Sequence, residues 1–369
     1  MDNNNEMMQG GAQDPNRAPE MGGAQVLNRS PEMGGAREQG SAPVRKATSS
    51  ADNSELLRID NLRKFFRIRD KSGKKSTLRA VDKVSLSIKR GETLGLVGES
   101  GCGKTTLGRT ILRLTEPDSG RITYDGVDIT RVNMRPYRSK MQIVFQDPYG
   151  SLDPRCRVMD IIAEGLRTRQ SGFSKAERKN RVRILLESVG LEQDSAYRYP
   201  HEFSGGQQQR IGIARALAVN PEFIVCDEPV SALDVSFQSQ IIALLQSLQE
   251  SFDLTYLFIS HDLSVIRYVS DRVGVMYLGK LVEFGSSEDV IASPTHQYTK
   301  ALIEAVPVPD PRLGQAMVRK VTEEGADLSI PEKGCRYCRI CEHTTEECFV
   351  EEPLLREVSP GHFCACHIV

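Results

Sequence analysis

Residues 93–105 have the sequence TLGLVGESGCGKT, and this stretch decides the fold of the chain. The apolar run at 93–97 has the length of a buried strand and passes directly into the pattern Gly-x-x-x-x-Gly-Lys-Thr. Glycines let the backbone curl around a phosphate with its N–H groups inward, and the N-terminus of a following helix adds positive potential. The stretch therefore predicts a strand, a phosphate-binding loop and a helix from Lys104 to Arg113.

The loop supplies the first predicted site residues. Lys104 is expected to reach the β- and γ-phosphates of a nucleotide, and the Thr105 hydroxyl is expected to ligate Mg²⁺. The residues expected to line the nucleotide are Gly98, Glu99, Ser100, Gly101, Cys102, Gly103, Lys104, Thr105 and Thr106. A chance glycine-rich loop is the alternative, and the flanking strand and helix disfavour it.

A second chemical element is FIVCDE at 223–228, an apolar strand that ends in two carboxylates. Ligands of parallel α/β sheets lie at the carboxyl ends of the strands, so both side chains are expected beside the phosphate loop. Asp227 is predicted to hold Mg²⁺, and Glu228 is predicted to act as general base toward the attacking water.

A third element is HEFSGGQQQR at 201–210, which leads into a predicted helix. A serine followed by two glycines at a helix start is itself an anion cradle, because the hydroxyl caps the helix and the dipole favours negative charge. One chain thus contains two phosphate-type cradles. That makes sense if the second cradle serves the γ-phosphate of a nucleotide on a partner subunit.

The segments around these motifs predict the fold class. Alternating patterns at 56–69 and 80–91, with a turn at KSGKK (71–75), predict antiparallel strands at the start of the domain. Further along, apolar runs of strand length alternate with helical segments, which predicts an α/β fold with a parallel sheet. The runs lie at 93–98, 141–147, 223–229 and 254–262, and the helical segments at 104–113, 158–190 and 235–252.

Composition narrows the classes of function. Lys and Arg total 48 against 49 Asp and Glu, so bulk charge does not support nucleic-acid binding, and no nucleic-acid partner is expected. We find neither a run of about 18 apolar residues nor the features of a signal peptide at the N-terminus, so a cytosolic location is expected. Residues 1–52 are of low complexity, with imperfect repeats starting at Gly10 and Gly22, and are predicted to be a disordered tail.

Roughly residues 56–290 resemble the nucleotide-binding domain of an ABC transporter. The resemblance is carried by six motifs in chain order: GESGCGKT, FQD, FSGGQQQR, FIVCDEP, SALD and ISHD. The resemblance implies an ATPase that uses ATP and Mg²⁺. It also implies a P-loop NTPase (RecA-like) α/β core with an antiparallel β subdomain, placed at 53–290, and a helical subdomain at about 148–205.

Carried over by position, the resemblance assigns further roles. Phe66, with Phe65 as the other choice, would stack on adenine, and a plain core role for Phe66 is the alternative. Gln146 would sense Mg²⁺ and the γ-phosphate. Asp234 would couple the two nucleotide sites of a dimer, and His261 would contact the γ-phosphate. The residues that would contact the nucleotide across the dimer are Ser204, Gly205, Gly206 and Gln207. Phe203 departs from the leucine usual in that motif, and it is an apolar exchange.

PYGSLDPR at 148–155 and DRVGVMYLGKLVE at 271–283 resemble the dipeptide and oligopeptide importers, and HDLSVIRYVSDRV is similar to the F-type member of their paired ATPases. The resemblance implies a second ATPase subunit (a paralogue or a second copy), two membrane permeases and an extracytoplasmic solute-binding protein. The chain would be peripheral on the cytoplasmic face of the inner membrane. Alternatives are a nickel or sugar importer, a soluble ABC ATPase acting on nucleic acid or ribosomes, and a non-hydrolysing partner subunit.

Residues 291–369 are predicted to form a small cysteine-rich C-terminal extension. Of the nine cysteines, Cys102, Cys156 and Cys226 are scattered and the rest lie between Cys335 and Cys366. In a reduced cytosol such clustering suggests a metal site. The extension resembles that of the peptide-importer ATPases, and matching by position selects Cys335, Cys341, Cys348 and Cys366 while leaving Cys338 and Cys364 as extra. The resemblance implies a [4Fe–4S] cluster; zinc and unligated thiols are the alternatives.

Overall fold

The computed structural model describes residues 54–69, 73, 75–168, 174–305 and 333–369. The predicted tail at 1–52 and the proline-rich stretch after residue 305 lie outside the described residues, as does most of the predicted turn at 71–75. All of these described residues belong to the unit Ser49–Val369.

A four-stranded antiparallel sheet opens the described chain, in the order β2-β1-β4-β5. Its strands are β1 (Glu55–Arg69), β2 (Lys75–Lys89), β4 (Ser119–Tyr124) and β5 (Val127–Asp128). In the first half of β1, Leu57 and Ile59 are buried while Arg58 between them is exposed, as expected for a strand with one face on a core. The predicted antiparallel opening is confirmed.

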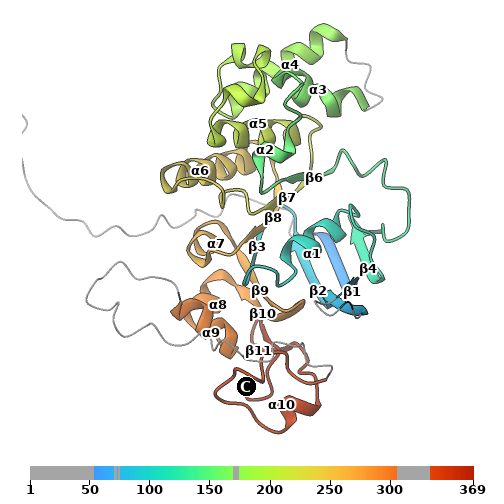
Figure 1. The fold of residues 1–369 in the computed structure, drawn as a ribbon, viewed down its shortest axis with the longest axis vertical. Helices are drawn as coiled ribbons and strands as arrows, with labels where there is room; N and C mark the ends of the chain where they lie inside the picture. The colour runs from blue at the N-terminus through green and yellow to red at the C-terminus, as the bar shows by residue number, and fades with distance from the viewer. Residues whose placement is uncertain (1–53, 70–72, 74, 169–173, 306–332) are drawn as a thin grey trace, which may run out of the picture. The chain divides into compact units, whose positions relative to one another are not determined.

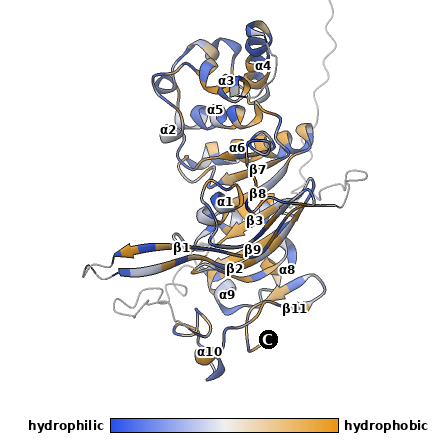
Figure 2. Cartoon of the chain, turned by 90° about the vertical axis from the view of Figure 1, so that its right-hand side faces the viewer, coloured by the Kyte–Doolittle hydropathy of each residue, from blue (hydrophilic) through white to orange (hydrophobic). Residues whose placement is uncertain are grey.

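The main sheet has eight strands in the order β11-β12-β10-β9-β3-β8-β7-β6. Its parallel part consists of β3 (Thr93–Val97), β6 (Met141–Val144), β7 (Phe223–Asp227), β8 (Thr255–Ser260) and β9 (Arg272–Tyr277). Ile224 and Cys226 pack into one buried cluster, and Phe223 and Val225 pack into another. The sheet is therefore covered on both faces, which explains why its strands are continuous apolar runs. Figure 2 shows the hydrophobic colour concentrated on these strands.

Helices fill the connections between the parallel strands, as Figure 1 shows. They are α1 (Lys104–Ile111), α6 (Val235–Phe252) and α7 (Leu263–Val269). The predicted parallel α/β core is confirmed. The prediction that the first helix reaches Arg113 is wrong: Arg113 has a left-handed φ of 49°, so the helix ends at Ile111 with Leu112 as its C-cap.

A helical region stands between β6 and β7, above the sheet in Figure 1. It contains α2 (Pro148–Ser151), α3 (Val158–Thr168), α4 (Lys175–Ser188), the short 3₁₀ helices η1 (Gln193–Tyr197) and η2 (Pro200–Glu202), and α5 (Gly205–Leu217). Apolar residues of α3, α4 and α5 share one buried cluster, so α5 connects the helical region to the core.

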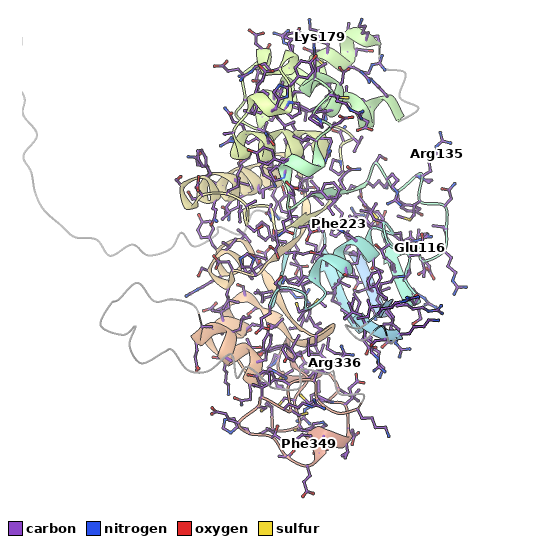
Figure 3. All side chains as sticks on the ribbon, viewed as in Figure 1. Glu116, Arg135, Lys179, Phe223, Arg336 and Phe349 are labelled. Atoms are coloured by element: carbon purple, nitrogen blue, oxygen red, sulfur yellow. The ribbon has the colours of Figure 1, made fainter. Side chains whose placement is uncertain are left out.

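The chain continues past β10 (Lys280–Ser286) through α8 (Ser287–Ala292) and α9 (Gln297–Glu304), and then α10 (Glu347–Val350), β11 (Arg356–Ser359) and β12 (His362–Cys364). β12 pairs antiparallel with β10, so the C-terminal segment adds its strands to the main sheet. Arg336 forms a buried ion pair with Asp82 of β2. Figure 3 shows Arg336 at this junction and Phe349 farther out on the extension. The predicted boundary at residue 290 falls within α8, and the division into domains stays a prediction.

Candidate nucleotide site

The loop between β3 and α1 has a shape that only glycine permits at two positions. Gly98 and Gly103 have φ angles of 152° and 111°, which L side chains rarely adopt. A Cβ atom would lie 2.2 Å from the Met276 carbonyl oxygen at the first position and 2.0 Å from the Ala80 carbonyl oxygen at the second. Gly98 and Gly103, which belong to the motif that identified the loop, are thus required because the loop passes close to the backbone of β9 and β2.

Lys104 lies directly at the start of α1. Its side chain is buried, and its ammonium donates hydrogen bonds to the carbonyl oxygens of Gly98 (2.6 Å) and Glu99 (2.9 Å). The N-cap residue of α1 is Gly103, which has no side chain to cap the helix and so leaves the first N–H groups to an anion. A buried cation and uncapped amides at one helix start form a site for a phosphate group.

Thr105 and Asp227 lie together at the carboxyl ends of β3 and β7. The Thr105 hydroxyl donates to Asp227 Oδ1 at 2.7 Å, while Asp227 Oδ2 is buried without a hydrogen-bond partner in the described part of the chain. Burial raises the pKa of Asp227, and the Thr105 hydrogen bond opposes that shift. The Arg109 guanidinium lies 3.8 Å from Oδ2. A hydroxyl beside a carboxylate oxygen that accepts no hydrogen bond fits Mg²⁺, which prefers oxygen ligands.

Three residues predicted to act on the γ-phosphate meet at the same edge of the sheet. Gln146 follows β6, Glu228 follows β7 and His261 follows β8. Glu228 Oε2 accepts a hydrogen bond from Gln146 Nε2 at 3.0 Å and lies 3.1 Å from His261 Nδ1. The structure therefore brings two residues that are far apart in the sequence, Gln146 and His261, to the Glu228 carboxylate.

The backbone of Glu228 is strained. Its φ is 47°, in the left-handed region that non-glycine residues rarely occupy. Its N–H donates to the Ile259 carbonyl at 3.0 Å, and its own carbonyl accepts from the Ser231 hydroxyl at 3.1 Å. Such strain persists where the surroundings over-determine the conformation, and it is concentrated at functional sites.

The serine–glycine cradle is built differently. Ser204 caps α5: its hydroxyl accepts from the Gln207 N–H, and the Gln207 side chain accepts in return from the Ser204 N–H at 3.0 Å. Gly205 and Gly206 form the first turn of the helix. Within the described residues, no hydrogen bond or ion pair joins 204–207 to the loop at 98–105. The structure forms this cradle but does not bring it to the first one.

Two further predicted residues lie at the surface. Phe66 on β1 is 37% exposed, with the Lys64 ammonium 5.4 Å from its ring centroid, so the alternative that it is a core residue is wrong. Asp234 is exposed at the N-cap position of α6, where its side chain makes no capping hydrogen bond.

The C-terminal cysteines surround one cavity. Cys335, Cys341, Cys348 and Cys366 all line it, and Cys338, which the sequence match had left out, lines it as well. All are free thiols, and burial raises the pKa of Cys335 to about 11. The donor chemistry fits a cluster or zinc, but among the described residues no three His, Cys, Asp or Glu side chains lie close enough to hold a metal ion.

Comparison with known proteins agrees with this geometry. The family model described as ABC transporter matches residues 81–231, and the one described as oligopeptide/dipeptide transporter, C-terminal region, matches residues 282–348. The oligopeptide transport ATP-binding protein OppF of Bacillus subtilis is 49% identical over 316 residues, covering 85% of this chain and 96% of OppF. AppF of the same organism, with the same description, is 48% identical over 330 residues, covering 87% of this chain and 99% of its own.

The chain belongs to the family of ABC transporter ATP-binding proteins.

Solved structures of ABC cassettes share its fold. The cassette MJ0796, described as a dimer in a post-hydrolysis state with ADP and Pi, has a TM-score of 0.57 at 29% identity, covering 63% of this chain and 99% of its own. CbiO1 of Clostridium perfringens, part of an ABC transporter complex, has a TM-score of 0.57 at 28% identity and covers 71% and 98%. The predicted ABC ATPase fold and ATPase activity are thus confirmed. Within the described residues, no helix has both the length and the hydropathy to span a bilayer.

Sequence motifs missed several residues that bear on the site of this ABC ATPase. Tyr298 of α9 accepts a hydrogen bond from the Glu99 N–H, and Arg336 donates to the Leu278 carbonyl beside the loop. Cys338 completes the ring of thiols. Only the cysteine had a signal, since its spacing in Cys-x-x-Cys-x-x-Cys was visible.

Proposed function

We propose that this chain is the ATP-hydrolysing subunit of an importer for dipeptides or oligopeptides, which it powers by ATP-driven closure of an ATPase dimer. Support comes from OppF and AppF, both named for oligopeptide transport and similar over most of the chain, and from the match to the oligopeptide/dipeptide transporter C-terminal region. Under this proposal the chain does not select the cargo, because the site described above is suited to nucleotide.

The reaction follows from the residues gathered at the sheet edge. Lys104 and the amides of the loop would bind the β- and γ-phosphates. A bound Mg²⁺, held by Thr105 and Asp227, would neutralise phosphate charge. Water would attack the γ-phosphorus, Glu228 would accept the proton, and ADP would leave with the bridging oxygen. Gln146 and His261 orient the Glu228 carboxylate, and both would approach the γ-phosphate.

The second half of the site would come from another subunit. Ser204, Gly205, Gly206 and Gln207 form an anion cradle separate from the chain's own phosphate loop, so a head-to-tail dimer would bring it to the partner's nucleotide. Phe66 would stack on adenine and Asp234 would couple the two sites. The helical region would contact two permeases, a solute-binding protein would deliver peptide, and the chain would be peripheral on the cytoplasmic face.

The observation that carries the proposal is the Glu228 carboxylate held between Gln146 and His261, beside the Thr105–Asp227 pair. The test uses the transporter complex purified through a tag on this chain, with and without Glu228→Gln. We expect the variant to bind ATP as the wild type does and to hydrolyse it at least about 100-fold more slowly, because general-base catalysis contributes about 10²–10⁴-fold. Turnover close to that of the wild type would remove Glu228 as the base.

We also propose that Cys335, Cys341, Cys348 and Cys366 hold a [4Fe–4S] cluster that cross-links the extension, with zinc as the alternative. The shared cavity and the free thiols support this, and the thiols would have to close on the cavity to bind. Iron and acid-labile sulfide analysis, with a visible spectrum, on anaerobically purified protein is expected to find both elements. Zinc alone, or no metal, would overturn the cluster.

A further inference from the structure

The start of the phosphate loop is held by a side chain from the far end of the chain. The backbone N–H of Glu99 donates a hydrogen bond to the Tyr298 hydroxyl at 2.9 Å. Tyr298 belongs to α9, outside every motif that identified the nucleotide site, and its side chain is 2% exposed. A buried hydrogen bond to a neutral phenol is difficult for water to replace.

The ring of Tyr298 is fixed by aromatic packing. Its centroid lies 4.5 Å from that of Tyr277, at the end of β9, and 5.6 Å from that of Tyr337 in the C-terminal extension. Burial raises the pKa of Tyr298, so the hydroxyl stays protonated and neutral. Both the position and the chemical state of the acceptor are therefore set before nucleotide arrives.

The start of α9 is pinned as firmly. Glu283 of β10 accepts the backbone N–H groups of Thr295 (2.7 Å) and His296 (2.9 Å), and its Oε1 also lies 2.7 Å from Nε2 of the buried His362 of β12. His296 in turn caps α9 by accepting the Tyr298 N–H at 3.0 Å. The helix that presents Tyr298 is thus tied to the main sheet and to the extension.

We propose that Tyr298 is a positioning residue for nucleotide binding, whose hydroxyl holds the Glu99 amide and with it the phosphate loop in the conformation that receives the triphosphate. This inference rests on the proposed nucleotide site. The loop contains three glycines with positive φ, at 98, 101 and 103, and would otherwise lose backbone freedom when ATP binds. An anchor that orders the loop in advance raises affinity without touching the ligand.

The matched control is a second buried tyrosine. The hydroxyl of Tyr256, at the opposite end of β8 from the site, donates to the Leu245 carbonyl at 3.1 Å, and its side chain is also 2% exposed. Tyr256→Phe and Tyr298→Phe each remove one buried hydroxyl and keep the ring. A merely structural role for Tyr298 would make the two variants alike.

The experiment measures the dissociation constant for Mg-ATP and the melting temperature of the full-length chain, together with KM and kcat of the transporter complex. We expect Tyr298→Phe to weaken ATP binding about fivefold, the effect of one neutral hydrogen bond, and to raise KM similarly with kcat nearly unchanged. Tyr256→Phe is expected to lower the melting temperature and leave ATP affinity within twofold.

Hydrogen exchange gives a second readout. Tyr298→Phe is expected to lower the protection of the Glu99 amide, and Tyr256→Phe is not. If the wild type binds ATP but Tyr298→Phe keeps the same affinity and the same protection of the Glu99 amide, the role of Tyr298 is overturned while the nucleotide site stands. An equal loss of affinity in Tyr256→Phe would also overturn that role. Failure of the wild-type chain to bind ATP would overturn the nucleotide site, and this role with it.

Discussion

The chain contains two anion cradles at helix starts, and they are held in opposite ways. The cradle at Lys104 is fixed by distant segments: Asp227 accepts from Thr105, and Tyr298 accepts from Glu99. The cradle at Ser204 is fixed locally, by its own capping box with Gln207. The first has an uncapped helix start, and the second has a capped one.

This difference indicates which half of a nucleotide site, the cradle at Lys104 or the cradle at Ser204, one chain can complete by itself. Distant contacts make the first cradle part of the core, ready to bind nucleotide. The second cradle belongs to the helical region. Its helix α5 packs into the core, and Gln209 of α5 donates a hydrogen bond to the Phe145 carbonyl, next to Gln146. A cradle that is complete in itself, and that no hydrogen bond among the described residues joins to its own phosphate loop, suits a partner's nucleotide.

The largest effect is expected from Lys104→Ala, which strikes the first cradle. The change removes the cation that would meet the phosphates and the bonds to the Gly98 and Glu99 carbonyls. Charge-assisted bonds are the strong ones, so we expect ATP affinity of the full-length chain to fall roughly a hundredfold, measured by equilibrium binding. An affinity within threefold of the wild type would contradict the assignment of this loop.

Ser204→Arg strikes the second cradle and should separate binding from turnover. We expect ATP affinity of the isolated chain to stay within twofold, while turnover of the transporter complex falls roughly thirtyfold, because the arginine would block a partner's nucleotide from the cradle. Ser174→Arg is the matched control, since Ser174 also caps a helix through a capping box with its N3 residue, Glu177.

Both serine variants lose a helix cap, which costs about 1 kcal/mol of stability. Only the Ser204 variant should lose turnover. If the two variants hydrolysed ATP equally, the second cradle would be structural, and the contrast between the cradles would have no bearing on mechanism.

The sequence predicted the nucleotide side well because its chemistry is local in the chain. Glycines at fixed spacing, a lysine at a helix start and two carboxylates after an apolar strand each have a physical reason to stand where they do. The parallel order of β3, β7 and β8 then brings the motifs to one edge. The motifs are far apart in the sequence, yet they lie together because the carboxyl ends of parallel strands share one edge of the sheet, where ligands of α/β folds bind.

The sequence failed where contacts are long-range and chemically ordinary. Tyr298 is an unremarked tyrosine in a short helix, and the buried pair of Arg336 and Asp82 joins residues with no shared motif. Such partners are determined by packing, which no local pattern records. The cysteines lie between these cases: their clustering was visible, but positional matching excluded Cys338, which lines the same cavity.

A comparison of folding stability uses one glycine from each cradle. In Gly103→Ala the new Cβ would lie 2.0 Å from the Ala80 carbonyl at a φ of 111°, so we expect a loss of about 3 kcal/mol in unfolding free energy. In Gly205→Ala the nearest atom is a Leu233 methyl at 3.5 Å in a helical turn, and stability should be unchanged or slightly higher. Equal melting temperatures for the two variants would mean that the first cradle is no more constrained than the second.

The smallest effect is a pH dependence confined to the first cradle. Burial lowers the pKa of His296 to about 4, and its Nδ1 accepts the Tyr298 N–H that starts α9. The unfolded chain binds a proton near pH 6.5 and the folded chain does not, so stability is lost as the pH falls from 6.5 toward 4. From pH 7 to pH 5 this group alone costs about 2 kcal/mol.

His296→Asn keeps a helix-capping oxygen and removes the titration, so the variant should lose about 2 kcal/mol less than the wild type between pH 7 and pH 5 in urea unfolding. Glu283, His362 and Tyr337 surround the same position and are present in both proteins, so the difference isolates His296. Acidification should also lower the hydrogen-exchange protection factor of the Glu99 amide and leave that of Gln207 unchanged, because only the first cradle is held through α9. A parallel fall at both amides would show that acid loosens the whole chain and that the two cradles are held alike.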